Sequence, residues 1–141
     1  MTILKNCLKT KKIFIENPEV EGVIHFAALK SVPESVENPQ LYFHNNNESL
    51  KNILTCLKEF RIKNFIFSSS CAVYGNINVL PVNEETPQQR AQSPYAQTKQ
   101  EGEKKIYEFS KQNPDIQSIA LRYFNPVGAH FSGLIGESPI G

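Results

Sequence analysis

The chain has 141 residues, and its 15 lysines and arginines are nearly balanced by 14 aspartates and glutamates, which leaves a formal charge of +1. A nucleic-acid-binding protein usually carries a larger, clustered basic excess, so no nucleic-acid partner is expected. Hydrophobic residues make up 40% of the chain, which argues against disorder. The apolar runs fall far short of the roughly 20 residues of a membrane span, and no secretory signal is visible, so we expect one cytoplasmic domain and no membrane partner.

The three cysteines, Cys7, Cys56 and Cys71, cannot all pair with one another and lack the spacing of metal ligands. We interpret them as reduced thiols, two of which fill the core. His44 and His130 show no metal-ligand spacing with Cys, Asp or Glu either, so no metal site is expected.

The first half of the chain predicts a helix, a strand and a second helix. Apolar residues at helical spacing indicate a helix within residues 1–18, with a turn at Asn17-Pro18. Val20 to Ala28 is nearly continuously apolar, as in a strand buried on both faces of a parallel sheet, and small residues at its end allow a ligand to come close. After a loop or helix start at Val32–Ser35, one apolar stripe predicts a helix from about Gln40 to Phe60.

The second half continues this alternation. Asn64 to Ser69 predicts a strand, and prolines and amides over residues 76–93 predict a surface loop. Ser93-Pro94 favours a helix start, and that helix is expected to end near Gln112. Ile116 to Phe124 predicts a third strand, and the residues from 125 onward are expected to be irregular.

The order strand, helix, strand, helix, strand indicates an α/β fold with a parallel sheet. Ligands of such sheets bind beyond the carboxyl ends of the strands. Those ends are residues 26–28, 68–70 and 123–125, which are rich in small, hydroxyl and amide side chains. This clustering is the first indication of a functional site.

Tyr95 and Lys99 are expected one turn apart on one face of a helix. A free tyrosine is a poor base at neutral pH, but a neighbouring ammonium favours the phenolate, so Lys99 could tune Tyr95 into a general base. The spacing alone is weak evidence, because a solvated lysine beside a half-buried tyrosine has the same pattern. Ser70 strengthens it, because its hydroxyl could bond the substrate oxygen that Tyr95 deprotonates.

Other polar residues have plainer interpretations. His25 lies within an apolar run and is interpreted as a core histidine. Lys30 could reach a phosphate or ribose, and Asn45–Asn47 could bind polar ligand groups, although such asparagines mostly face water. Glu84 and Glu85 are expected to be solvated in the loop. The sequence contains no G-x-G-x-x-G stretch, the phosphate-binding turn that opens a dinucleotide-binding fold.

Four stretches of the chain resemble the UDP-glucose 4-epimerase family of extended short-chain dehydrogenases/reductases. They are HFAALK (25–30), NFIFSSSCAVYG (64–75), SPYAQTK (93–99) and LRYFNPVGAHFSGLIG (121–136). The Tyr-x-x-x-Lys pair with its serine-bearing strand is typical of the whole superfamily, whereas the RYFNPVGAH stretch is more specific. The resemblance implies a partial Rossmann-like, doubly wound parallel sheet, the second half of an NAD-binding fold.

The family pattern continues beyond both ends of the chain. Residues 1–141 are therefore expected to form an incomplete NAD(P)-binding domain, without the glycine-rich N-terminal part and the C-terminal substrate domain. Ala72 stands where the family often has a threonine. The resemblance also implies a homodimer of the full-length protein, formed by the two long helices.

The implied reaction interconverts UDP-glucose and UDP-galactose, in galactose metabolism, by transient oxidation at the sugar C4 with bound NAD. Tyr95 would take the proton of the 4-hydroxyl, Ser70 would bond the same oxygen, and Lys99 would bond the nicotinamide ribose. The implied cofactor contacts are Phe26, Ala27, Ala28, Leu29, Lys30, Asn45, Tyr95, Lys99, Tyr123 and Phe124. The implied substrate contacts are Lys30, Ser70, Cys71, Ala72, Tyr95, Tyr123, Phe124 and Asn125.

Two alternatives stay open. A related NAD-dependent sugar-nucleotide dehydratase or decarboxylase would share these features, although a dehydratase needs a carboxylate after the serine strand, where Cys71-Ala72 stands. The other alternative is an inactive fragment that no longer turns over.

Overall fold

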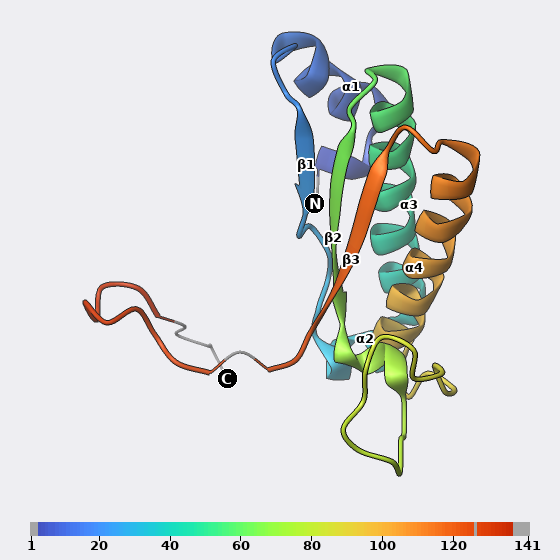
Figure 1. Ribbon diagram of the computed structural model, residues 1–141, viewed down its shortest axis with the longest axis vertical. Coiled ribbons are helices and arrows are strands. Elements are labelled where there is room, and N and C mark those ends of the chain that lie inside the picture. Colours follow the sequence, from blue (N-terminus) through green and yellow to red (C-terminus); the bar gives the residue numbers. More distant parts are fainter. Residues whose placement is uncertain (1–2, 126, 137–141) are drawn as a thin grey trace.

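A computed structural model describes residues 3–125 and 127–136. Within these residues, three parallel strands form a sheet in the order β1-β2-β3: β1 (Gly22–His25), β2 (Asn64–Ser70) and β3 (Gln117–Tyr123). Two long helices, α3 (Pro39–Glu59) and α4 (Pro94–Gln112), pack against one face of the sheet (Figure 1). The predicted α/β fold with a parallel sheet is confirmed.

Shorter helical segments precede and connect these elements. The 3₁₀ turn η1 (Ile3–Lys5) and helix α1 (Cys7–Glu16) precede β1, and helix α2 (Val32–Glu37) lies between β1 and α3. The 3₁₀ turn η2 (Cys71–Tyr74) follows β2 directly. Stacked rings of Phe14 and Phe60, with centroids 5.5 Å apart, join α1 to the end of α3. The helix predicted within residues 1–18 is therefore present.

The core lies between the sheet and the two long helices. Side chains alternate along a strand, so Phe65 and Phe67 of β2 both point toward the helices, where they are buried. They meet the apolar stripe of α3, which consists of Leu50, Ile53, Leu54 and Leu57. Gly102 lets α4 approach β2 closely, because a Cβ at this position would lie 2.9 Å from Cζ of Phe67.

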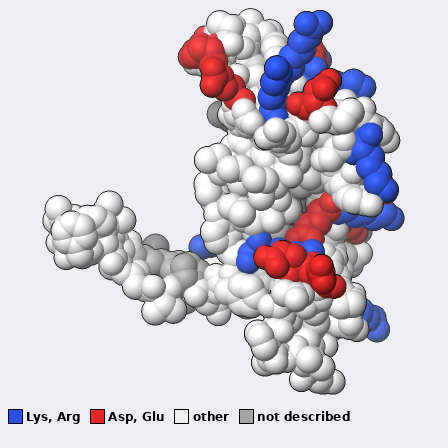
Figure 2. Space-filling view, viewed as in Figure 1, with Lys and Arg blue, Asp and Glu red and all other residues white. Residues whose placement is uncertain are grey.

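The other face of the sheet is uncovered in the described part of the chain. The strand register places Ile24, Ile66 and Ile119 side by side on this face, and Ile24 is 58% exposed. The prediction of a first strand buried on both faces is therefore wrong, because α3 and α4 pack on one side only. The strand is also shorter than predicted and ends at His25, the last β1 residue in register with β2. Figure 2 shows mostly uncharged surface at the level of the strands.

All three cysteines are free thiols. Cys56 is buried in the core, but Cys7 and Cys71 are only half-buried, because they begin α1 and η2 at the edges of the packed layers. The expectation of two core cysteines is therefore wrong for one of them. Among the described residues, no helix has the length and apolar character needed to cross a membrane, and no three His, Cys, Asp or Glu side chains gather as a metal site requires.

Candidate active site

The carboxyl ends of the strands meet at the lower end of the molecule in Figure 1, where η2 and the beginning of α4 also lie. Ser70 ends β2, Tyr123 ends β3 in register with it, and Tyr95 lies in the first turn of α4. The structure therefore brings these three predicted site residues to one edge of the sheet.

The first turn of α4 is fixed by a helix cap. The Ser93 hydroxyl oxygen accepts a hydrogen bond from the Ala96 amide at 3.1 Å, and Pro94 occupies the first turn, where its missing N–H costs nothing. This is the helix start predicted from Ser93-Pro94. It places Tyr95 at the N-terminal end of α4 and Lys99 one turn later.

Lys99 is buried, with an exposed fraction of 5%. Its Nζ donates to the Ser68 carbonyl oxygen at 2.6 Å and lies 5.7 Å from the centroid of the Tyr95 ring. Burial disfavours the ammonium and lowers the pKa of Lys99 to about 8. The predicted pair of Tyr95 and Lys99 is therefore formed, and its cation is anchored on the end of β2.

Helix α4 carries a second tyrosine–lysine pair of the same spacing, Tyr107 and Lys111. The Lys111 Nζ lies 4.2 Å from the centroid of the Tyr107 ring. Tyr107 is 62% exposed, and the pair lies toward the C-terminal end of α4, away from the strand ends. The two pairs differ in their place in the fold and not in their spacing.

The serines that end β2 have different partners. The Ser69 side chain points toward α4, and its hydroxyl donates to Glu103 at 2.5 Å. Ser70 lies on the open face, and its Oγ accepts a hydrogen bond from the Ala72 amide at 3.2 Å. Ser70 therefore caps η2, which places Cys71 and Ala72 next to it at the sheet edge.

Exposed aromatic rings lie at the carboxyl end of β3, in two separate contacts, and Tyr123 is in register with Ser70. The ring centroids of Phe26 and Tyr123 are 6.4 Å apart, and those of Tyr74 and Phe124 are 6.3 Å apart. Phe26, Tyr123 and Phe124 are all exposed, so their rings are open to a ligand.

The loop after β1 contains the remaining predicted cofactor residues. Ala27, Ala28 and Leu29 are half-buried there, and Lys30 is exposed. Asn125 follows β3 and is exposed as well.

The asparagines of α3 do not simply face water, as the sequence suggested. Asn45 and Asn46 are buried. The Asn46 side-chain oxygen accepts from the Leu29 amide at 2.9 Å, and its NH₂ donates to the Leu29 carbonyl and to the Thr98 hydroxyl, each at 3.1 Å. The water-facing interpretation is therefore wrong for Asn45 and Asn46, because α3 packs here against both the loop after β1 and α4. Nothing in a run of three asparagines indicates that Asn46 holds this loop.

His25 is the core histidine that the apolar run predicts. It is buried, and its ring lies 6.0 Å from that of Phe67 and 6.4 Å from that of Phe65, centroid to centroid. Burial, with a smaller contribution from the charge of Lys99, lowers the pKa of His25 to about 4. The ring is therefore neutral at pH 7.

Sequence analysis also missed an ion pair near the site. Arg122 of β3 binds the carboxylate of Glu103 on α4, with Nη2 and Oε2 2.8 Å apart. This hydrogen bond raises the pKa of Arg122 above its ordinary value. The two residues lie 19 positions apart, so no local pattern connects them.

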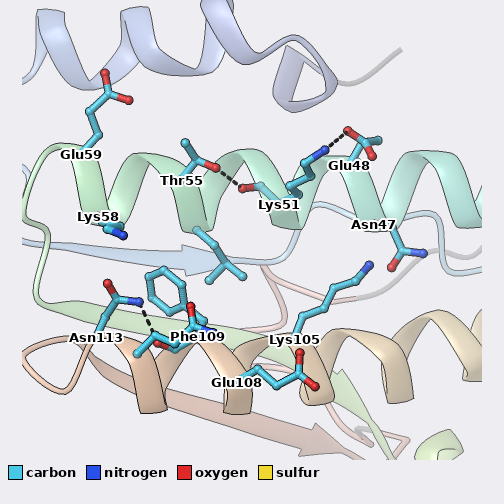
Figure 3. A pocket seen from close by; sticks show the side chains of 12 residues that line it. Asn47, Glu48, Lys51, Thr55, Lys58, Glu59, Lys105, Glu108, Phe109 and Asn113 are labelled. Carbon is cyan, nitrogen blue, oxygen red and sulfur yellow. Dashed lines mark hydrogen bonds and ion pairs between the residues drawn. The ribbon is translucent and has the colours of Figure 1, made fainter.

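A groove of about 720 Å³ runs between α3 and α4, away from the strand ends (Figure 3). The apolar side chains of Leu54 and Phe109 line it together with charged residues of both helices. Asn47, one of the three asparagines that could bind polar ligand groups, lines this groove, but none of the implied catalytic, cofactor or substrate contacts does.

Comparison with known proteins identifies the family. The sequence profile of the NAD dependent epimerase/dehydratase family matches residues 4–137. The chain belongs to this family. The UDP-glucose 4-epimerases of Caenorhabditis elegans and Haemophilus influenzae are 46% and 44% identical to it, and each alignment covers 93% of this chain but 38% of the relative. This member of the family therefore spans well under half the length of these relatives.

Solved structures show the same partial match. The UDP-glucose 4-epimerase of Bifidobacterium longum, in complex with NAD+ and UDP, superposes with a TM-score of 0.91 at 42% identity, over 98% of this chain and 41% of that chain. The enzyme of Stenotrophomonas maltophila, with bound NAD and formylated UDP-arabinopyranose, superposes with a TM-score of 0.89 at 38% identity, over 98% and 40%. The expected partial Rossmann-like fold is confirmed.

Proposed function

We propose that this chain carries the catalytic residues of a UDP-glucose 4-epimerase, an isomerase that interconverts UDP-glucose and UDP-galactose with NAD. The observation that carries the proposal is the buried Lys99 beside Tyr95 at the carboxyl edge of the sheet, in a chain whose relatives are UDP-glucose 4-epimerases. Residues 1–141 are proposed to form an incomplete NAD(P)-binding domain.

In the proposed mechanism, Tyr95 removes the proton of the sugar 4-hydroxyl and later returns it. The Lys99 ammonium, 5.7 Å from the Tyr95 ring, favours negative charge on the phenol oxygen. The Ser70 hydroxyl, at the sheet edge, bonds the same sugar oxygen and holds it toward Tyr95. NAD, when bound, supplies a reversible hydride acceptor for the sugar C4, and the reaction involves no net oxidation.

The donor and aromatic groups at this edge fit the nicotinamide end of NAD. The exposed rings of Phe26 and Tyr123 offer apolar surface to a flat ring, and the Lys99 ammonium, which has three N–H donors, can also donate to a ribose hydroxyl. The proposed cofactor contacts are residues 26–30, Asn45, Tyr95, Lys99, Tyr123 and Phe124. The proposed contacts of the UDP-sugar are Lys30, Ser70, Cys71, Ala72, Tyr95, Tyr123, Phe124 and Asn125.

A chimera tests this function, in which residues 4–137 replace the matching segment of the B. longum epimerase. We expect the chimera to interconvert the two UDP-sugars, and Tyr95→Phe to lower turnover by about 10²-fold or more, because general acid–base transfer contributes that much. NAD should remain bound in this variant. Tyr107→Phe is the matched control and should leave turnover unchanged. A folded chimera without activity, or full turnover with Tyr95→Phe, would contradict the proposal.

We further propose that α3 and α4 form a homodimer interface in the complete protein, and that the enzyme acts in galactose metabolism in the cytoplasm. The groove between the two helices, with Leu54 and Phe109 in it, supports a helical interface. Three free thiols suit a reducing compartment. Analytical ultracentrifugation of the chimera tests the interface, and a monomer would contradict it.

A further inference from the structure

Arg122 of β3 and Glu103 of α4 form a two-point ion pair close to the candidate site. Nε of Arg122 donates to Oε1 at 3.0 Å, and Nη2 donates to Oε2 at 2.8 Å. The side chains of Arg122 and Glu103 are only 20% and 11% exposed. A planar guanidinium can make this parallel pair of bonds, whereas a lysine ammonium cannot.

Each partner of the pair also holds neighbouring segments. The Glu103 carboxylate accepts hydrogen bonds from the Ser69 hydroxyl at 2.5 Å and from the Gln88 amide at 2.6 Å. Arg122 Nη1 donates to the Tyr74 hydroxyl at 3.1 Å and to the backbone carbonyl of residue 84 at 3.3 Å. The pair therefore joins the end of β2, η2 and the loop of residues 76–92 to α4 and β3.

The joined segments are the ones that carry the proposed reacting groups. Ser69 precedes Ser70 in β2, and Arg122 precedes Tyr123 in β3. Glu103 lies one helical turn after Lys99 on α4. The loop held by Arg122 and Glu103 leads directly into the cap of α4 and Tyr95. The ion pair is therefore linked to Ser70, Tyr95 and Lys99 through the segments that carry them.

We infer that the Glu103–Arg122 pair is a positioning device, which holds the end of β2 and the loop of residues 76–92 against α4 so that Ser70 and Tyr95 reach one substrate oxygen. This inference rests on the proposed function. Proton transfer requires hydrogen-bond distances, and a displacement of about 1 Å can cost about 10²-fold in rate. The two-point geometry, and not the charge alone, should therefore matter for turnover.

Arg122→Lys in the chimera tests this geometry, because it keeps the positive charge and removes the planar guanidinium that makes two parallel hydrogen bonds. We expect kcat to fall by about tenfold or more, with KM for UDP-galactose and the Kd of NAD within about threefold of the parent chimera. Arg90→Lys, the same exchange at an exposed arginine of the same loop, should leave all three values within about twofold. A kcat for Arg122→Lys close to that of the parent would overturn the inference.

Hydrogen exchange of the 141-residue chain, measured by mass spectrometry at sub-micromolar concentration, tests the same inference without activity. The reporter is the Gln89 amide, which donates to the Tyr74 carbonyl at 3.0 Å and joins the loop to η2. Arg122→Lys should speed its exchange by about tenfold, while the amide of Leu57 in the core of α3 changes by less than about twofold. Equal acceleration at both amides would mean general destabilisation and would overturn the positioning role.

The Gln89 exchange separates this inference from the proposed function. If the parent chimera is folded but inactive, the proposed function fails, whereas the Gln89 exchange still shows whether the pair holds the loop. If Arg122→Lys does not fold, Glu103→Gln replaces it, because the amide keeps the volume and loses the paired charge. The same loss of kcat is expected from Glu103→Gln, and unchanged turnover there would count against the inference.

Discussion

The Lys99 ammonium is buried, and burial lowers its pKa in the folded chain to about 8, from its ordinary value of 10.5. Below pH 8 both the folded and the unfolded chain hold this proton, so folding bears the full cost of burying the charge. Between pH 8 and 10.5 the unfolded chain binds more protons, so this group makes the free energy of unfolding rise with pH, by up to about 3 kcal/mol. We therefore expect Lys99→Met to remove this rise, and urea unfolding at several pH values measures it. Lys111→Met, at an exposed lysine, should retain the rise, and an unchanged pH dependence in Lys99→Met would contradict the assignment.

His25 should govern the acid side of the stability profile. Its pKa is lowered from 6.5 to about 4, so the neutral ring stabilises the fold above pH 6.5. As the pH falls toward 4, His25 binds a proton in the unfolded chain but stays neutral in the folded chain. The free energy of unfolding therefore falls by up to about 3 kcal/mol. We expect His25→Phe to reduce this loss, measured by chemical unfolding between pH 4 and 7. His44→Phe, at an exposed histidine on α3, should behave as the parent chain does.

The packing of α4 on β2 depends on the absence of a side chain at Gly102. Alanine is the better helix former by about 1 kcal/mol, but its Cβ would lie 2.9 Å from Cζ of the buried Phe67 ring. Because the ring is enclosed by the core, we expect Gly102→Ala to lower the free energy of unfolding by about 1–3 kcal/mol. Urea denaturation measures this change. Lys104→Ala, two residues along on the exposed side of the same helix, is the control and should change stability little. A stabilised Gly102→Ala variant would show that the ring moves aside freely.

The open face of the sheet should dominate the behaviour of the 141-residue chain in solution. Ile24, Ile119 and Tyr123 are exposed on this face, which carries few charges (Figure 2). Contiguous exposed apolar surface with unpaired strand edges favours self-association. We expect the chain to associate at micromolar concentration and Ile119→Lys to shift it toward monomer, as measured by light scattering. Phe65→Lys, the same charge on the helix-covered face, should instead unfold the chain. Association that is unaffected by Ile119→Lys would show that another surface is responsible.

The local elements of this protein could be predicted from its sequence because their signals are short-ranged. The apolar stripe of residues 40–60, the Ser93-Pro94 cap and the run 64–69 each depend on neighbours within a few positions, and the structure contains all three elements. The parallel direction of the three strands also followed from the alternation of strands and helices. The carboxyl edge, with Ser70, Tyr95 and Tyr123, was therefore available from the sequence as a candidate site.

Long-range packing determined the rest. Two Tyr-x-x-x-Lys pairs lie on α4, and tertiary packing buries Lys99 at the strand ends but leaves Tyr107 exposed. The inward turn of Asn46 and the partnership of Glu103 with Arg122 depend on contacts between segments far apart in the sequence. The exposure of Ile24 depends on which side of the sheet the helices cover. Hydrophobic periodicity specifies that a face is apolar, but which partner covers it is set by tertiary packing between distant residues.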